Sequence, residues 1–251
     1  MRIKKTKHKP ILARARKPME AAAETPVQRF FKPITKRWRL IAGVAAGVVV
    51  AAGIVGGTMW YRHDREDRAA RAYALLRGKA ATRAEEAVKK AGASGNVDEE
   101  KLVTATIKDL DGFIARYGET GAGRAATYDL ASIYFGRGDY KKASAYFADA
   151  KSKAKGLEKT LAAKGIGDCY LGQGEYKRAI ATYKEIYDAA PDGFPGVAVG
   201  MALAECYRHE GRYKDAAAIY RRVVDYNVLS PFAAEAREEL TRFEEIEEGK
   251  K

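Results

Sequence analysis

Apolar residues recur three and four positions apart through the C-terminal half of the chain, and glycines interrupt this pattern at regular intervals. Such a period is typical of helices that bury one face. It predicts three pairs of helices joined at Gly138, Gly174 and Gly211. The packed faces comprise Leu130, Ala131, Tyr134, Ala143, Phe147 and Ala150; Ile166, Gly167, Tyr170, Ala179, Tyr183 and Ile186; and Leu203, Ala204, Tyr207, Ala216, Tyr220 and Val223. We therefore expect an all-α fold in which tyrosines fill the space between closely approaching helices.

One short motif recurs at the turn of each pair. A tyrosine is followed four residues later by Gly-x-Tyr-Lys-x-Ala, and the copies begin at Tyr134, Tyr170 and Tyr207. A period of roughly 20 to 50 residues marks a stack of repeats, because no unit of this size can bury its apolar face alone. The recurrence predicts a binding surface rather than an enzyme.

The repeated positions also resemble a known family. A bulky apolar residue has a small neighbour, a tyrosine follows three positions later, and an alanine and an aromatic residue lie four apart beyond the turn glycine. This pattern is similar to the tetratricopeptide repeat, which implies a solenoid of helical hairpins. The chain departs from that family where a tryptophan is usual, since Thr127, Ala163 and Gly200 replace it. Only Pro191 matches the closing proline of a repeat.

Further helices are predicted on both sides of the repeats. We interpret two upstream apolar stripes, separated by a break at residues 92–96, as a divergent first repeat. The stripes comprise Tyr73, Leu76, Ala80, Ala84 and Val88, then Val103, Ile107, Leu110, Ile114 and Tyr117. Downstream, Ser230 is expected to cap a helix that Pro231 opens. This terminal helix would cover the end of the solenoid with Phe232, Ala236, Leu240 and Phe243.

Residues 40–61 carry no charge. A helix of this length is about 33 Å long, which is enough to cross a hydrocarbon core of about 30 Å. Trp38 on one side, and Trp60 with Tyr61 on the other, lie where aromatic side chains favour the membrane interface. The segment is therefore predicted to be a transmembrane helix.

Two other interpretations of residues 40–61 are a buried helix of a soluble protein and a cleaved signal peptide. The long leader and the bulky Met59, Trp60 and Tyr61 at the place of cleavage favour an uncleaved anchor. A lipoprotein anchor is excluded because no cysteine lies near the segment.

The positive charge of the chain lies mainly in its N-terminal tail. Residues 1–39 hold 13 lysines and arginines against Glu20 and Glu24, a net +11 of the total +13. Short basic segments stay on the cytoplasmic side, so we expect a disordered cytoplasmic tail with the repeats outside. The flank at residues 62–79 is also basic. Because the repeats themselves carry little net charge, we expect no nucleic-acid partner.

The expected segments are thus a tail at 1–39, a transmembrane helix at 40–61, a stem with the divergent repeat at 62–118, three repeats at 119–229, and a capping helix with a polar tail at 230–251. Within the transmembrane helix, Gly43 with Gly47 and Gly53 with Gly57 form two pairs of small residues four apart. Such a face allows close helix packing, either with another copy or with another membrane protein. The alternative is that glycine and alanine simply dominate this segment.

The candidate chemistry of the chain is sparse. His8, His63 and His209 lie in the tail, beside the apolar segment and at a repeat turn, so no catalytic grouping can be assembled from them. Metal-ligand spacings and phosphate-binding glycine loops are also missing from the sequence. We therefore expect no enzyme activity, no cofactor and no metal site.

Two cysteines occupy the same position in successive repeats, Cys169 and Cys206. Neighbouring helices lie about 8 to 10 Å apart, which is too far for an unstrained disulfide bond. The sequence therefore predicts two reduced, packed thiols.

The resemblance to tetratricopeptide repeats implies a peptide-binding groove along the first helices. Its residues here would be Tyr128, Asp129, Ser132 and Phe135; Lys164, Asp168 and Leu171; and Met201, Glu205 and Arg208. Asp129, Asp168 and Glu205 suit a peptide that mixes apolar and basic side chains; the alternative is a solvated face without a ligand. The asparagines of the family's carboxylate clamp are missing from these positions, so recognition of a C-terminal carboxylate is not supported.

The layout of anchor, helical pair and repeats is similar to the ancillary Sec-translocon subunit family. That resemblance implies an adaptor or chaperone-like factor in the bacterial inner membrane, with periplasmic repeats and with the translocon, chaperones or exported polypeptides as partners. An alternative is a self-associating coordinator of envelope assembly or division, similar to the Tol-associated repeat proteins. A third hypothesis, a cytoplasmic scaffold, requires the reverse topology.

Overall fold

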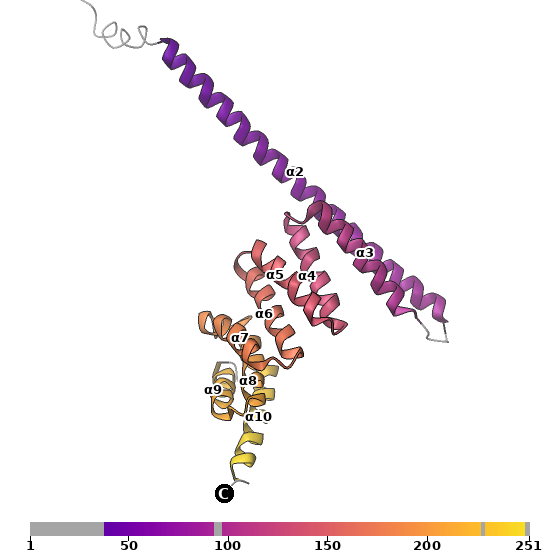
Figure 1. Cartoon of the computed structure of the whole chain (residues 1–251), viewed down its shortest axis with the longest axis vertical. Coiled ribbons are helices and arrows are strands. Elements are labelled where there is room, and N and C mark those ends of the chain that lie inside the picture. The colour runs from indigo at the N-terminus through magenta and orange to yellow at the C-terminus, as the bar shows by residue number, and fades with distance from the viewer. Residues whose placement is uncertain (1–37, 93–96, 227–228, 249–251) are drawn as a thin grey trace, which may run out of the picture. The chain divides into compact units, whose positions relative to one another are not determined.

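The computed structural model describes residues 38–92, 97–226 and 229–248, and these residues are almost entirely helical (Figure 1). Residues 1–37 of the expected tail at 1–39, and residues 93–96 of the expected break at 92–96, lie outside the described residues. The described residues divide into two units between Trp60 and Tyr61, and one helix runs through this boundary. The helices are α2 (Trp38–Ala91), α3 (Glu99–Tyr117), α4 (Gly121–Gly136), α5 (Tyr140–Lys153), α6 (Gly156–Gly172), α7 (Tyr176–Ala189), α8 (Gly196–His209), α9 (Tyr213–Tyr226) and α10 (Pro231–Glu248).

The three expected hairpins are α4 with α5, α6 with α7, and α8 with α9, and each helix from α3 to α10 packs on the next one (Figure 1). The turn glycines Gly138, Gly174 and Gly211 have φ angles of 75°, 72° and 71°. An L-residue rarely adopts this left-handed conformation, which explains a glycine at each turn. The all-helical solenoid expected from the sequence is confirmed.

The tyrosine that precedes each turn supplies its backbone to the turn. The amide of Asp139 donates to the carbonyl of Tyr134 at 2.9 Å, and the amide of Gly138 donates to Phe135 at 2.9 Å. These are the two hydrogen bonds of a Schellman C-cap. The same pattern recurs at Tyr170 and Tyr207. The motif is therefore repeated because it ends one helix and begins the next.

Aromatic rings pack against small residues inside and between the hairpins. A Cβ added at Gly167 would lie 2.5 Å from the ring of Tyr183, and one added at Gly200 would lie 2.8 Å from the ring of Tyr187. Thr127, Ala163 and Gly200, which replace the family's tryptophan, are all buried. Smaller residues at this position leave room for the rings of neighbouring helices.

The tyrosine inside each motif reaches the following unit. A Cβ added at Gly172 would lie 2.6 Å from the ring of Tyr140. The ring of Tyr176 stacks on His209 with a centroid distance of 4.4 Å, and Tyr213 meets Phe243 of α10 at 5.4 Å. Each repeat is thus joined to the next one by an aromatic contact.

The second half of α2 packs on α3 through a cluster that includes Ala69, Tyr73, Leu110 and Phe113. One part of the expected stripe on α2 is wrong. Ala84 and Val88 are exposed, and the partly buried positions are Ala80, Arg83 and Ala87. Arg83 takes the inner position because its guanidinium pairs with Asp109 of α3 at 2.9 Å. A charged residue can therefore belong to the packed stripe, which apolar periodicity alone does not reveal.

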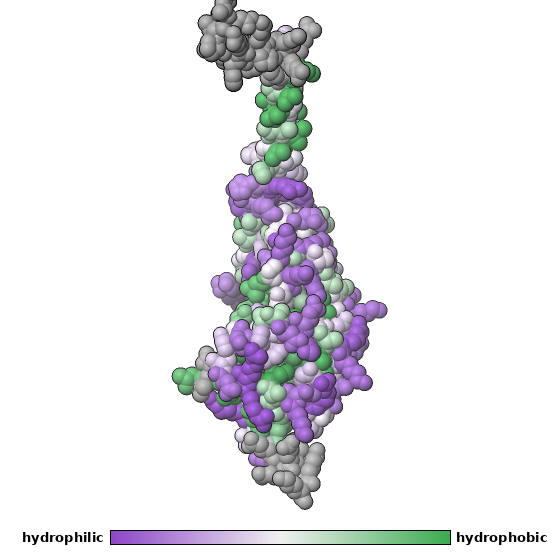
Figure 2. Space-filling view, turned by 90° about the vertical axis from the view of Figure 1, so that its left-hand side faces the viewer, coloured by the Kyte–Doolittle hydropathy of each residue, from purple (hydrophilic) through white to green (hydrophobic). Residues whose placement is uncertain are grey.

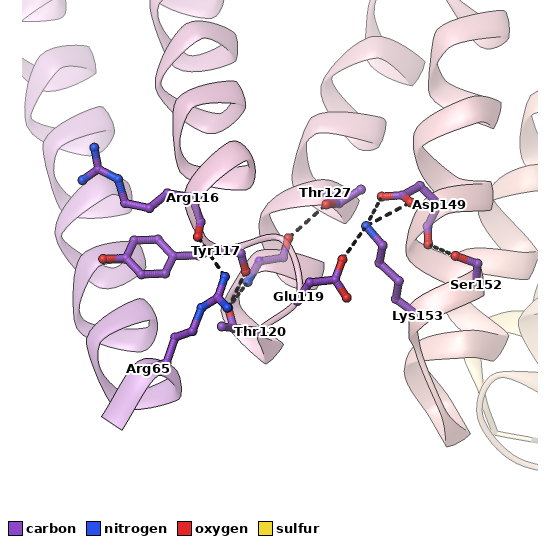
Figure 3. A network of polar contacts seen from close by, with 10 residues as sticks. Arg65, Arg116, Tyr117, Glu119, Thr120, Thr127, Asp149, Ser152 and Lys153 are labelled. Atoms are coloured by element: carbon purple, nitrogen blue, oxygen red, sulfur yellow. Dashed lines mark hydrogen bonds and ion pairs between the residues drawn. The ribbon is translucent and has the colours of Figure 1, made fainter. Parts of the chain in front are cut away.

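Polar contacts fix α2 to the junction of α3 and α4 (Figure 3). Arg65 donates to the carbonyl of Arg116 at 3.2 Å, near the C-terminal end of α3. Glu66 accepts from the amide of Gly121 at 2.9 Å, at the first residue of α4. The two contacts satisfy backbone groups that helix ends leave without partners. Beside them, Lys153 of α5 binds Glu119 of the same junction at 3.4 Å (Figure 3).

Helix α10 begins at Pro231, where the terminal helix was expected, and packs on α9. Its first turn is capped by the hydroxyl of Ser230, which accepts from the amide of Ala233 at 3.1 Å. Ala236 and Phe243 are buried, whereas Phe232 is 40% exposed. Leu240 is also partly buried. Three of the four expected residues therefore face the repeats at least in part.

The first half of α2 exposes apolar side chains on all sides. Val44, Val50, Ile54 and Met59 are between 61% and 68% exposed. Figure 2 shows this part of the helix as a mostly apolar stretch. Among the described helices, α2 alone is long and apolar enough to cross a membrane by length and composition. A Cβ added at Gly43, Gly47, Gly53 or Gly57 would meet no atom within 4 Å.

Candidate peptide-binding groove

The residues expected to line a groove all lie on α4, α6 and α8, the first helices of the three repeats. These helices also contact one another, α4 with α6 and α6 with α8. Ser132 is exposed, and most of the other residues are partly buried. Met201 is only 8% exposed and belongs to the core around α9, so it offers little surface to a ligand.

The three acidic residues of this face have partners within the protein. Asp129 accepts a hydrogen bond from the hydroxyl of Tyr73 in α2. One oxygen of Asp168 accepts from Tyr183 at 2.6 Å, and Lys164 donates to both of its oxygens at 2.8 and 2.9 Å. Burial raises the pKa of Tyr183, and the nearby Asp168 raises it further. The carboxylates of Asp129 and Asp168 therefore help to hold the fold.

Glu205 has a weaker internal contact. Its carboxylate lies 3.8 Å from Nε2 of His209, one turn further along α8. Arg208 donates toward the same histidine ring at 3.3 Å. Glu205 and Arg208 thus stand in the third repeat at the positions that Ser132 and Phe135 take in the first repeat.

A pocket of about 270 Å³ opens where α4 meets α6, and α2 forms one of its walls. Its apolar lining includes Ala125 and Tyr128 of α4, Ala150 of α5 and Leu161 of α6. We call this space the α4–α6 pocket. Of the ten predicted groove residues, only Tyr128 and Asp129 line it.

Charged groups lie at the edge of the α4–α6 pocket. Arg124 pairs with Glu158 at 3.2 Å, and the guanidinium of Arg77 lies 6.0 Å from the centre of the Tyr73 ring. Arg77 has no carboxylate partner within the described parts of the chain. An apolar space with a few polar groups at its edge is suited to an apolar side chain of a peptide.

Sequence reasoning missed the contribution of α2 to this pocket. Tyr73 and Asp129 are 56 residues apart and belong to different predicted units. The one available signal is the tyrosine itself, because a buried tyrosine hydroxyl usually needs a polar partner. The sequence offers many acidic residues as partners and does not select Asp129 among them.

Within the residues that the structure describes, no group of three or more histidine, cysteine or acidic side chains could hold a metal ion. His63 lies in α2, and His209 stacks on Tyr176, whereas His8 is outside the described residues. Cys169 and Cys206 are free thiols with no exposed surface. Burial raises the pKa of each thiol to about 12.

The buried thiols are expected to make the fold sensitive to alkali. Unfolded thiols ionise near pH 8.5 while the folded ones stay protonated, so the unfolded state binds fewer protons. The free energy of unfolding should fall from about pH 8.5 to 10 by up to about 1.4 kcal/mol per pH unit for each thiol. Urea unfolding across this range measures the slope.

The variant Cys169→Ala with Cys206→Ala is the control for this slope, which should become much shallower in it. Iodoacetamide without reductant should also leave the folded protein unmodified at pH 8 and label both thiols after denaturation. Equal labelling of the folded and denatured protein would contradict the expected burial.

Two models of the tetratricopeptide repeat family match the chain, one over residues 128–194 and one over residues 170–240. A crystal structure of nearly identical tetratricopeptide-like repeats from Podosopora anserina is 15% identical, with a TM-score of 0.52 over 70% of this chain and 84% of that one. A tetratricopeptide repeat protein from Parabacteroides merdae is 16% identical, with a TM-score of 0.51 over 68% of this chain and 59% of that one. Among curated proteins, none matches the chain significantly. Residues 128–240 of this chain are therefore tetratricopeptide repeats.

Proposed function

We propose that the protein is a membrane-anchored adaptor whose repeats bind a segment of another polypeptide along α4, α6 and α8. The observation that carries this proposal is the α4–α6 pocket, with its apolar lining and its charged edge. Tetratricopeptide repeats are a fold for protein binding, and their stacked helices offer an extended surface. The α4–α6 pocket would hold an apolar side chain of the bound segment, which fixes the position of that segment.

Residues 40–61 are the proposed anchor. Their apolar side chains are exposed around the whole helix, which suits contact with lipid on every side. The basic tail would remain in the cytoplasm and the repeats would lie in the periplasm. The partners would then be exported polypeptides, their chaperones or the translocon.

Photocrosslinking in intact bacterial cells tests the adaptor proposal. A photoreactive phenylalanine analogue is placed at Tyr128 or Leu171 on the groove, and at the exposed Ala181 of α7 as the matched position away from it. We expect adducts with exported polypeptides or translocon subunits from the two groove positions and few adducts from Ala181. Protease added to spheroplasts should digest the repeats if they are periplasmic.

Filling the α4–α6 pocket sharpens this test. Ala125 is exposed at the pocket, so Ala125→Trp should occupy the space without disturbing the core, and adducts from Tyr128 should fall several-fold. Ala181→Trp is the matched substitution on α7 and should leave the adducts unchanged. Equal adducts from all three positions, insensitive to Ala125→Trp, would reject the groove as the binding site.

A further inference from the structure

A second groove of about 440 Å³ lies between α2 and α3, on a surface separate from the α4–α6 pocket. Its apolar lining includes Leu75, Leu76, Phe113 and Tyr117. Leu75 is 74% exposed, whereas Phe113 is 7% exposed and forms the floor. We call it the α2–α3 groove. A leucine this exposed beside aromatic residues is a surface that a partner would stabilise by removing it from water.

The edge of the α2–α3 groove carries unbalanced positive charge. Lys79 of α2 and Lys108 and Arg116 of α3 line it, and none of them has a carboxylate partner in residues 38–92, 97–226 or 229–248. Figure 3 shows the Arg116 side chain without a polar contact, although its carbonyl accepts from Arg65. The one acidic residue of the groove, Asp109, is paired with Arg83. The groove therefore favours an anionic ligand.

A glycine without a packing role also lines this groove. Gly123, Gly165, Gly167 and Gly200 lie inside helices of the repeats, and a Cβ at any of them would meet another group closely. A Cβ at Gly112 of α3 would meet nothing within 4 Å. Glycine inside a helix costs about 1 kcal/mol relative to alanine. Gly136 at the end of α4 is equally open, so it is the position in the α2–α3 groove that matters: the missing side chain of Gly112 keeps this part of the groove accessible to a partner.

The spacing of the charges indicates the shape of the ligand. Lys108 and Arg116 are eight residues apart on one helix, which places their backbones about 12 Å apart. Carboxylates two turns apart on a partner helix have nearly this spacing, and apolar residues between them would face Leu75 and Phe113. We propose that the α2–α3 groove binds an acidic amphipathic helix of a partner protein, which packs beside α2 and α3 as a third helix.

Fluorescence anisotropy with the full chain in neutral detergent tests this proposal. The probe is a labelled synthetic amphipathic helix of about three heptads, with leucines on one face and glutamates flanking them. A second probe carries lysines in place of the glutamates. We expect only the acidic probe to bind, with an affinity that falls as salt rises from about 50 to about 200 mM.

Two kinds of variant should each weaken binding of the acidic probe at least about tenfold, equivalent to about 1.4 kcal/mol. Gly112→Leu fills the groove, and circular dichroism should show that it folds because its side chain enters open space. Lys79→Glu with Lys108→Glu and Arg116→Glu reverses the charge of three exposed residues, and the lysine probe should now bind. Gly136→Leu, at an equally open glycine in α4, is the control and should bind as the unmodified chain does.

Three results would overturn the proposal. The first is binding of the two probes with equal affinity, or no effect of either kind of variant. The second is that the charge reversal abolishes binding to vesicles of anionic phospholipid while probe binding persists, which would make the groove a lipid site. The third is self-association of the chain that Gly112→Leu abolishes. The occupant of the groove would then be a second copy, whose acidic helix would be α10 with its seven glutamates.

Discussion

Gly123→Ala is expected to lower the free energy of unfolding of the first repeat by about 3 kcal/mol or more. Gly123 lies in the first turn of α4, and an added Cβ would be 1.9 Å from the carbonyl oxygen of Tyr117 and 2.7 Å from the Cα of Gly118. These atoms belong to the backbone, so they cannot avoid the methyl group by changing rotamer. Because Arg65 and Glu66 hold the same junction, the ends of α3 and α4 cannot separate without losing further hydrogen bonds.

Hydrogen exchange of the full chain in detergent measures this effect by region, since stacked repeats can open independently. Protection should fall in α3 and α4 and stay nearly unchanged in α9 and α10. Gly136→Ala is the matched control in the same helix, where the added methyl group meets no atom within 4 Å. That variant should be neutral or up to about 1 kcal/mol more stable. Equal protection in both variants would mean that the end of α3 can move away from α4 and accept the added methyl group.

Tyr183→Ala is expected to lower the free energy of unfolding by about 3 to 5 kcal/mol. The ring of Tyr183 has no exposed surface and fills the space that Gly167 leaves in the second hairpin. Its removal creates a cavity and takes one hydrogen bond from Asp168. Tyr183 also belongs to the cluster that extends to Phe243 of α10, so the loss should weaken the third repeat as well.

Urea unfolding followed by circular dichroism checks the Tyr183 prediction. Tyr183→Phe keeps the ring, and Asp168 keeps its ion pair with Lys164, so the loss should be only about 1 to 2 kcal/mol. Tyr226→Ala removes a ring that is 51% exposed and should change stability by no more than about 0.5 kcal/mol. If the phenylalanine variant lost as much as the alanine variant, the hydrogen bond rather than the packing would stabilise this hairpin.

The repeats could be predicted from the sequence because one local solution is used three times. The turn needs a glycine with positive φ, and the helices after it need an alanine and an aromatic ring at fixed spacing. Tyr134, Tyr170 and Tyr207 recur because the carbonyl of each accepts the same hydrogen bond at the end of its helix. The α2 stripe was predicted less well, since Arg83 lies on the packed side only because Asp109 faces it from another helix.

The candidate site was the least predictable part. Tyr128 and Asp129 could be placed on the groove by analogy with the repeat family, but the wall that α2 supplies depends on contacts between distant residues. The same is true of Met201, whose position in the repeat matches that of Tyr128 although its surroundings bury it. Equivalent positions in a repeat share a backbone site, and their exposure depends on what each neighbouring helix carries.

The aromatic contacts between units give the chain a fixed order. Tyr140 needs the small Gly172 opposite it, Tyr176 needs the flat ring of His209, and Tyr213 needs Phe243. In a chain without its second repeat, Tyr140 would face the imidazole of His209 instead of Gly172. Each junction is thus matched to its own neighbour. The three units share a motif but are not interchangeable modules, and exchanging them would create mismatched junctions.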